Sequence, residues 1–384
     1  MTTSDRIPLS QVRDILQIGR ALPFRVLDSQ HRLLLNEGQV LVDEAQFDAL
    51  IERGAWAERS LVEAERRARA AASQAPPVVA QLSLFDRWER LLWQFDKLSR
   101  ALSRKEQPGS AVAPFFVTLQ ALVDRDPDVA LFLCTRQEDR RYALYPLRHA
   151  IHCAVLALLA GRQLGWPAAQ CTSIGSAALT MNLSILELQA AMAEQDTPPT
   201  RKQFEQIRAH PEATAAMLRA AGIADEEWLG AVAAHHEQPG GGGYPRGQGE
   251  VSQAAQVLRA ADVYMSKISP RAKRPPMVPQ IAVRQLFQQH PGDPLAMAII
   301  RTLGAHPPGS LVRLNSGEIG VAIRRPVTGP HPLVATLSDK NGRPSGETHR
   351  RDTAQPEFAV EGPPQDATAF ARVLPERVYG VIAG

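Results

Sequence analysis

The most informative stretch of this chain is His235-His236-Glu237, followed after a short gap by Gly241-Gly242-Gly243-Tyr244-Pro245-Arg246-Gly247. Two adjacent histidines and a carboxylate at the end of a helical pattern are residue types that bind metal ions. A histidine pair alone is more often an ordinary helix-end feature. The glycine-rich turn that closes on Tyr244-Pro245 shifts the balance, and together the two motifs favour a functional site.

Helical patterns surround this stretch from about residue 111 to residue 305. Asp225 is a suitable N-cap for the helix that leads to His235 and His236. Pro198-Pro199-Thr200 marks another helix start, and Gly165 marks a helix end. Apolar spacing and these end signals predict helices over 84–104, 112–125, 144–164, 168–184, 201–220 and 252–269. The central part of the chain is therefore expected to be an all-helical bundle.

Both ends of the chain have shorter, strand-like patterns. Residues 1–58 are predicted to form a small β-rich module, with a hairpin from 22–27 and 32–35 and a helix over 43–53. Residues 59–110 read as a helical tail to about 80, a linker around Gln74-Ala75-Pro76-Pro77 and an amphipathic helix. In 306–384 we expect three strands, at 311–314, 319–323 and 333–337, and then a polar tail. The predicted fold class is mainly α, with a small β part at each end.

Composition limits the classes of function. The 384 residues include 43 basic and 40 acidic ones, a net charge of +3 that does not indicate a nucleic-acid partner. No signal-peptide pattern opens the chain, and no uncharged apolar run approaches the roughly 20 residues of a membrane span. The three cysteines have no CxxC spacing and are expected to be reduced and buried. We therefore expect a cytoplasmic protein.

The motifs resemble those of the HD-GYP family, bacterial metal-dependent phosphohydrolases that cleave the second messenger cyclic di-GMP. The likeness covers roughly residues 140–345 and is strongest over 235–271. It implies a helical bundle with bound metal. The positions that match the family's metal ligands are His149, His210, His235, His236 and Asp262.

The glycine-rich loop has a chemical logic of its own. Its glycines permit positive φ and a close backbone approach, and Arg246 offers a fixed positive charge for a phosphate. The resemblance implies that this loop recognises the substrate or contacts a diguanylate-cyclase domain. The loop residues concerned are Gly241, Gly243, Tyr244, Pro245 and Arg246. An ordinary glycine-rich loop remains the alternative.

The departures from the family pattern bear most on activity. Met181 and Asn182 stand where the family has its His-Asp pair. A binuclear phosphodiesterase site holds two cations about 3.5–4 Å apart. Asn182 lacks the negative charge that a bridging aspartate supplies, and the Met181 thioether is a poor ligand for hard cations. We therefore expect one divalent ion, iron or manganese, or none, and not a binuclear centre.

Plainer interpretations stand beside these. His149 also suits a buried core histidine, Asp262 a surface charge paired with Arg259, and Met181 a space-filling side chain. Three functions stay open. The favoured one is a degenerate HD-GYP module, non-catalytic or weakly active, that acts in cyclic di-GMP signalling. The others are an active metal-dependent cyclic di-GMP phosphodiesterase and a structural interaction scaffold.

Overall fold

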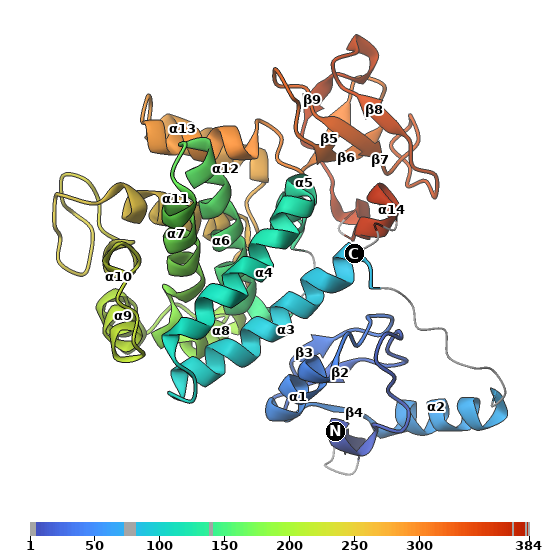
Figure 1. Ribbon diagram of the computed structural model, residues 1–384. Helices are drawn as coiled ribbons and strands as arrows, with labels where there is room; N and C mark the ends of the chain where they lie inside the picture. Colours follow the sequence, from blue (N-terminus) through green and yellow to red (C-terminus); the bar gives the residue numbers. More distant parts are fainter. Residues whose placement is uncertain (1–4, 73–81, 138–140, 371, 381, 383–384) are drawn as a thin grey trace.

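The structure is a computed structural model that describes residues 5–72, 82–137, 141–370, 372–380 and 382 (Figure 1). The linker predicted around Gln74-Ala75-Pro76-Pro77 lies outside the described residues. An N-terminal module with a small sheet is followed by a helical body and a C-terminal antiparallel sheet. The prediction of a mainly α fold with a small β part at each end is therefore confirmed.

The N-terminal module is a four-stranded antiparallel sheet with the order β1-β4-β2-β3. The predicted hairpin is present as β2 and β3, which pair across the turn that follows Leu27. Asp43 caps α1 by accepting a hydrogen bond from the Gln46 N–H. The elements are β1 (Arg6–Pro8), β2 (Val26–Leu27), β3 (Leu33–Leu35), α1 (Glu44–Glu52), β4 (Trp56–Glu58) and α2 (Arg59–Ala72).

The helical body follows the predicted helices closely but contains additional ones. The Thr200 hydroxyl accepts from the Gln203 N–H at 3.3 Å, and the Gln203 side chain accepts from the Thr200 N–H, so a capping box starts α9. The helices are α3 (Leu84–Ser103), α4 (Val112–Arg125), α5 (Pro127–Thr135), α6 (Tyr145–Gln163), α7 (Ala168–Thr180), α8 (Leu186–Glu194), α9 (Arg201–Ala220), α10 (Glu226–Ala234), α11 (Gln253–Ile268), α12 (Pro279–Gln289) and α13 (Pro294–Leu303). The helix predicted over 168–184 ends at Thr180, and a 3-10 turn (Leu183–Ile185) leads into α8.

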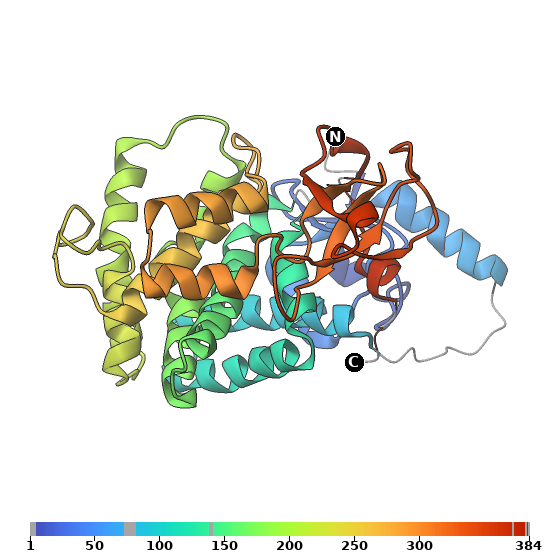
Figure 2. The ribbon, with the colours of Figure 1, turned by 90° about the horizontal axis from the view of Figure 1, so that it is seen from above.

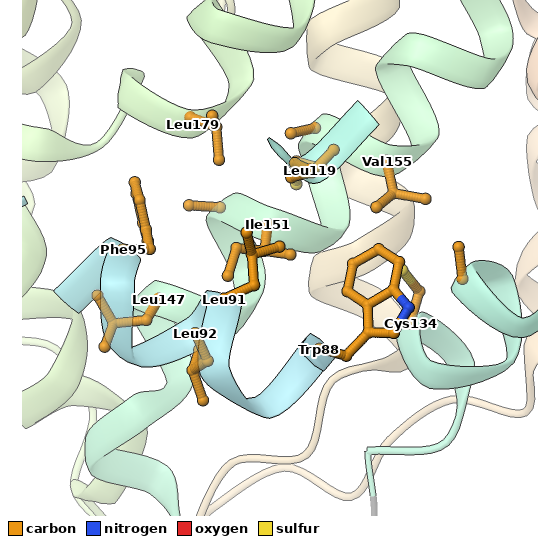
Figure 3. Close-up of a cluster of buried hydrophobic side chains, with 14 of the residues drawn as sticks. Trp88, Leu91, Leu92, Phe95, Leu119, Cys134, Leu147, Ile151, Val155 and Leu179 are labelled. Carbon is orange, nitrogen blue, oxygen red and sulfur yellow. The ribbon is translucent and has the colours of Figure 1, made fainter. Parts of the chain in front are cut away.

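Helix α6 is the centre of the body. Its side chains are buried along almost its whole length, and it packs against α7, α11 and α13. Figure 3 shows Leu147, Ile151 and Val155 of this helix among apolar side chains of α3, α4 and α7. Residues Tyr142–Gln163 are long and apolar enough to cross a membrane by composition, yet 83% of the most apolar window is buried inside the protein. Such burial is typical of the core helix of a helical domain.

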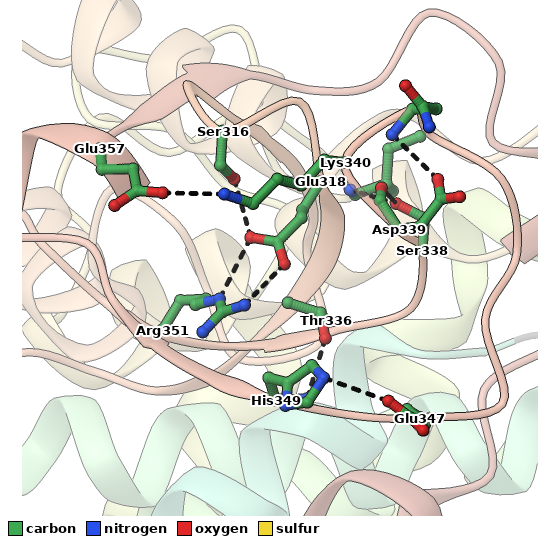
Figure 4. Close-up of polar contacts among 12 residues, drawn as sticks. Ser316, Glu318, Thr336, Ser338, Asp339, Lys340, Glu347, His349, Arg351 and Glu357 are labelled. Carbon is green, nitrogen blue, oxygen red and sulfur yellow. Dashed lines mark hydrogen bonds and ion pairs between the residues drawn. The ribbon is translucent and has the colours of Figure 1, made fainter.

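The C-terminal sheet has five strands in the order β8-β7-β6-β5-β9, all paired antiparallel. The three predicted strands are present, but the presumed polar tail adds two strands and a short helix. Glu318, buried in this sheet, accepts two hydrogen bonds from Arg351 at 2.8 and 3.1 Å and one from Ser316 (Figure 4). The elements are β5 (Leu311–Leu314), β6 (Ile319–Arg324), β7 (Leu333–Thr336), β8 (Arg350–Asp352), β9 (Val360–Gly362) and α14 (Pro375–Tyr379).

Both β parts lie at the same side of the helical body, as Figures 1 and 2 show. Arg53 of the N-terminal module donates to the buried Asp96 carboxylate of α3. Arg324 of β6 pairs with Asp126, the N-cap of α5, at 2.5 Å. The loop that follows α10 lies at the opposite end of the body (Figures 1 and 2).

Candidate metal and ligand site

Four helices of the body bring the predicted ligand residues together. His149 lies on α6, His210 on α9 and Asp262 on α11. The helix predicted to carry the histidine pair is shorter than expected, because α10 ends at Ala234. His235 is its C-cap and His236 follows in the turn. The pair therefore lies at the carbonyl end of a helix, just before the glycine-rich loop.

His210, His235 and His236 form a compact group whose candidate ligand atoms all lie within 4.8 Å of one another. The Nδ1–H of His210 donates to the Ile207 carbonyl at 2.6 Å, and that of His235 donates to the Val232 carbonyl at 2.7 Å. This main-chain contact leaves a lone pair on each Nε2. The same outer contact orients the metal-binding histidines of many proteins.

The burial of these rings keeps them neutral. Burial, with the nearby His236, lowers the pKa of His210 to about 4. Burial and His210 lower the pKa of His235 to about 4, and burial and His235 lower that of His236 to about 3. A metal ion binds the deprotonated imidazole, so the group is in its binding form at neutral pH.

His149 and Asp262 form a second group beside the first. The Asp262 Oδ1 lies 2.7 Å from the His149 Nε2, so this aspartate pairs with His149 and not, as the alternative had it, with Arg259. Burial alone would raise the pKa of Asp262, but the hydrogen bond and charge of His149 lower it below its ordinary range. Cys153 lies 3.5 Å from His149, and burial raises the pKa of its thiol, which stays protonated.

Both groups open onto one cavity of about 210 Å³. His149, His210, His236 and Asp262 line it, and the Asn182 side chain lies at its wall. Met181 is fully buried in the hydrophobic core at the end of α7 and is not among the cavity's lining residues. Among the described residues, Asn182 alone of the two altered motif positions therefore faces the site, and Met181 does not fill it.

The histidine group offers a complete set of donors for one divalent cation. Three neutral imidazoles are typical ligands of a single transition-metal ion. Of the described residues that line the cavity, Asp262 is the only carboxylate, and it already accepts a hydrogen bond from His149. The amide of Asn182 has no charge with which to hold a second cation next to the first.

The glycine-rich loop covers one side of this cavity. The Tyr244 ring stacks on His236 with ring centres 4.5 Å apart. Gly243 packs so tightly that an added Cβ would lie 2.5 Å from the Glu237 Cα. The buried Glu237 carboxylate accepts the Arg246 N–H at 2.7 Å and the Gly247 N–H at 3.2 Å. These contacts hold Tyr244 at the site, since they fix the backbone on both sides of it.

Arg246, the arginine predicted to offer its charge to a phosphate, lies outside the cavity. Its guanidinium pairs with Glu212 at 2.6 Å on the surface and does not line the cavity. The arginine that does line it is Arg271, which follows α11. Arg271 donates to Ser266 at 2.9 Å and to the Tyr145 hydroxyl, and its guanidinium lies 4.7 Å from the Tyr145 ring centre. No local sequence signal marks Arg271, because only the fold brings it to the histidines.

The comparisons with known proteins concern the family and the fold of the helical body. A family model described as HD domain matches residues 131–292. The cyclic di-GMP phosphodiesterase PA4108 of Pseudomonas aeruginosa is 26% identical over 211 residues, which is 54% of this chain and 50% of that protein. The chain thus matches about half the length of this curated relative.

A solved structure gives the same picture at the level of the fold. Bd1817, an HDG"Y"P protein from Bdellovibrio bacteriovorus, superimposes with a TM-score of 0.50 over 78% of this chain and 98% of that chain. Its sequence identity is 12%, so this likeness concerns the fold. Residues 131–292 of the helical body match the HD domain family. The sequence and fold likenesses together support membership of the HD-GYP family.

Proposed function

We propose that this protein is a regulatory HD-GYP module that binds cyclic di-GMP with one divalent iron or manganese ion, or none, and hydrolyses it weakly or not at all. The observation that carries the proposal is the Asn182 amide at the cavity wall, beside three converging histidines and a single carboxylate. The relative whose name states a cyclic di-GMP phosphodiesterase supports the choice of ligand.

The cavity supplies the groups that a cyclic dinucleotide needs. Arg271 presents a cationic fork that suits a phosphate, and the exposed Arg208 lies 5.5 Å from the Tyr244 ring centre. The Tyr244 ring, stacked on His236, offers an aromatic face at the rim. A ligand phosphate held by Arg271 would lie near His149 and Asp262, since all three line the same cavity.

The low expected turnover follows from the charge of the site. When bound, a metal ion supplies a Lewis acid and an activated water to phosphodiester cleavage. His210, His235 and His236 would hold such an ion. Asn182 keeps the shape of an aspartate but adds no negative charge, so it does not help to retain a second cation against the repulsion of the first. The residues therefore suit binding better than hydrolysis.

An active metal-dependent phosphodiesterase is the second candidate, favoured by one observation. The five ligand-type residues lie in two neighbouring groups, and four of them line the cavity. A scaffold without ligand is the third, and the exposed loop surface around Arg246 would then dock a partner such as a diguanylate-cyclase domain. Metal content and turnover distinguish the active phosphodiesterase from the regulatory module. Binding of cyclic di-GMP distinguishes both of these from the scaffold.

The test combines elemental analysis, a cyclic di-GMP titration and a hydrolysis assay on the full chain. We expect one iron or manganese ion per chain or fewer, binding of cyclic di-GMP, and negligible turnover with added Mn²⁺. His236→Ala should lower metal content and weaken binding. His349→Ala, which changes an exposed histidine of the C-terminal sheet, should do neither. Turnover abolished by His236→Ala would establish the phosphodiesterase instead, and an absence of binding would favour the scaffold.

A further inference from the structure

The turn of the N-terminal hairpin reaches the helical body beside the histidine cavity. Asp28, which is 2% exposed, holds this turn, because its Oδ1 accepts the N–H groups of Gln30 at 2.9 Å and Arg32 at 3.0 Å. Its Oδ2 accepts the Arg32 Nε–H at 2.6 Å, so the arginine side chain is fixed on the turn. The Arg32 Nη1 lies 3.3 Å from the carboxylate of Glu194, the last residue of α8. The hairpin therefore presents an oriented cation to the end of that helix.

Helix α8 forms part of the wall of the histidine cavity. Leu188, Gln189 and Met192 of this helix line the cavity, as does the buried Ala193 next to Glu194. Arg32 itself does not line it. Because a helix moves as a stiff unit, a shift at the end of α8 would change the position of these lining side chains. The contact between Arg32 and Glu194 therefore bears on the shape of the cavity.

The end of α8 also holds the segment that carries Arg271, the arginine at the cavity wall. The Ala193 carbonyl accepts the Ala272 N–H at 2.9 Å, although the two residues are far apart in the sequence. Ala272 belongs to the irregular segment after α11, in which Arg271 and Arg274 form main-chain hydrogen bonds to each other. The bond to Ala193 ties this segment to α8. Its donor follows Arg271 directly, and its acceptor precedes Glu194.

A second contact of the hairpin leads to the same arginine by another path. Strand β3 packs against the 3-10 helix Tyr142–Leu144, and this short helix packs against α8. Tyr145, whose hydroxyl and ring contact Arg271, is the next residue and begins α6. The hairpin therefore contacts the elements that carry both supports of Arg271, the Tyr145 side chain and the end of α8.

We propose that Arg32 is a positioning residue for the histidine cavity: through Glu194 and the end of α8, it holds Arg271 in place for a ligand phosphate. The N-terminal module then completes the site without touching the ligand, and a displaced hairpin lowers the affinity. The choice of cyclic di-GMP as the ligand rests on the proposed function. The contacts that lead from Arg32 to Ala272 do not depend on that choice.

Hydrogen exchange on the full chain without ligand tests the positioning directly. Arg32→Ala should make the Ala272 amide exchange about two- to fivefold faster, the effect expected when a partly exposed ion pair is lost. Glu194→Gln should act in the same direction, and Arg32→Lys, which keeps the charge, should restore most of the protection. Arg25→Ala is the matched control, because Arg25 precedes the same hairpin but pairs with Glu58 inside the module. It should leave the exchange of Ala272 unchanged.

Calorimetric titration with cyclic di-GMP tests the consequence for the ligand. Arg32→Ala should weaken binding about two- to fivefold. It should leave the metal content unchanged, because the histidines that would hold the ion belong to α9 and the end of α10. In an Arg271→Ala background, Arg32→Ala should have almost no further effect, since residues that act through one another are not additive. A variant that merely loosened the fold would weaken binding equally in both backgrounds.

The proposal is overturned if exchange at Ala272 is unchanged in Arg32→Ala, or if Arg25→Ala accelerates it as much. It is also overturned if the losses of affinity in Arg32→Ala and Arg271→Ala add up in the double variant. If the wild-type chain does not bind cyclic di-GMP, the proposed function fails, and the exchange of Ala272 still decides the role of Arg32.

Discussion

The Nε2 atoms of His210 and His235 lie 3.1 Å apart, although neither ring has a hydrogen to place between them in its neutral form. Each ring donates its Nδ1–H to a main-chain carbonyl. The lone pairs of the two Nε2 atoms therefore face each other inside the protein. A shared proton or a cation relieves this repulsion. The stability of this pair should therefore depend on pH and on bound metal.

Acid should destabilise the metal-free protein in a defined window. The unfolded histidines take up protons near pH 6.5, but the folded His210 and His235 do so only near pH 4. Because the unfolded chain binds more protons between these values, stability falls as the pH is lowered through the window. We expect a loss of up to about 1.4 kcal/mol per pH unit for each histidine.

Urea unfolding in EDTA at closely spaced pH values measures this slope. His210→Gln should make it shallower, and saturating Mn²⁺ should stabilise the protein most at the neutral end, where the imidazoles are free to bind it. Asp262 adds its own loss only at more acid pH, since its pKa is lowered. A flat profile between pH 6.5 and 4 would contradict the burial of neutral histidines.

Asn182→Asp should increase the metal content. The side chain is 4% exposed and lines the histidine cavity, so the new carboxylate would face a cavity that His149, His210 and His236 also line. Without metal, the variant should be less stable by about 1–3 kcal/mol, because a buried charge has no partner there. Elemental analysis and melting curves with and without Mn²⁺ measure both effects. Asn182→Ala, which adds no charge, is the control and should gain no metal.

Glu237 should hold the glycine-rich loop in place. Glu237→Ala removes the acceptor of the Arg246 and Gly247 N–H groups and should cost about 2–3 kcal/mol. Glu237→Gln keeps an acceptor oxygen and should cost less. Hydrogen exchange at these two amides reports the loop directly, and it should become faster in the alanine variant. Unchanged exchange would show that other contacts fix the loop.

Gly243 and Gly242 should respond differently to the same added methyl group. A Cβ at Gly243 would meet the Glu237 Cα and the His236 carbonyl oxygen within 2.6 Å. Gly242→Ala meets no atom within 4 Å and strains only a φ of +85°. We expect about 1–2 kcal/mol for Gly242→Ala and more for Gly243→Ala. Equal melting temperatures for the two variants would contradict the close packing of the loop on Glu237.

Arg271→Ala should weaken the binding of cyclic di-GMP about tenfold or more, provided that the proposed ligand is right. Arg271 lines the histidine cavity, and removing a phosphate-binding arginine loses a charged hydrogen bond. Arg246→Ala should have little effect on affinity or stability, because its pair with Glu212 is exposed on both sides. Titration of both variants with cyclic di-GMP distinguishes the two arginines. A larger loss of affinity in Arg246→Ala than in Arg271→Ala would assign the phosphate contact to Arg246 instead.

Local signals in the sequence predicted much of the fold. Thr200 and Asp225 are helix caps whose side chains accept main-chain hydrogen bonds in the structure. Helices α5, α8, α12 and α13 were not placed individually. Helix α8 shows why: it has no side-chain cap and follows a 3-10 turn that extends the preceding apolar pattern.

The site was harder to predict than the fold. The motif spacing pointed to the five residues that the structure brings together, but it assigned the phosphate-binding charge to Arg246. Sequence distance hides Arg271, which reaches the site through its contacts with Ser266 and Tyr145. The strands β8 and β9 were missed because they are three residues long and mostly polar. Their pairing partners are set by the sheet and not by their own pattern.

The carbonyl end of α10 contributes to the electrostatic potential at the histidine pair, in addition to the side chains. His235 is the C-cap of this helix, and His236 is the next residue. The aligned peptide groups of a helix concentrate about half a negative charge at its last carbonyls, within the final turn. A cation held by this histidine pair would therefore lie in a favourable backbone field. Carboxylates are scarce at this site, so the main-chain dipoles of α10 would supply part of the negative potential that attracts a cation.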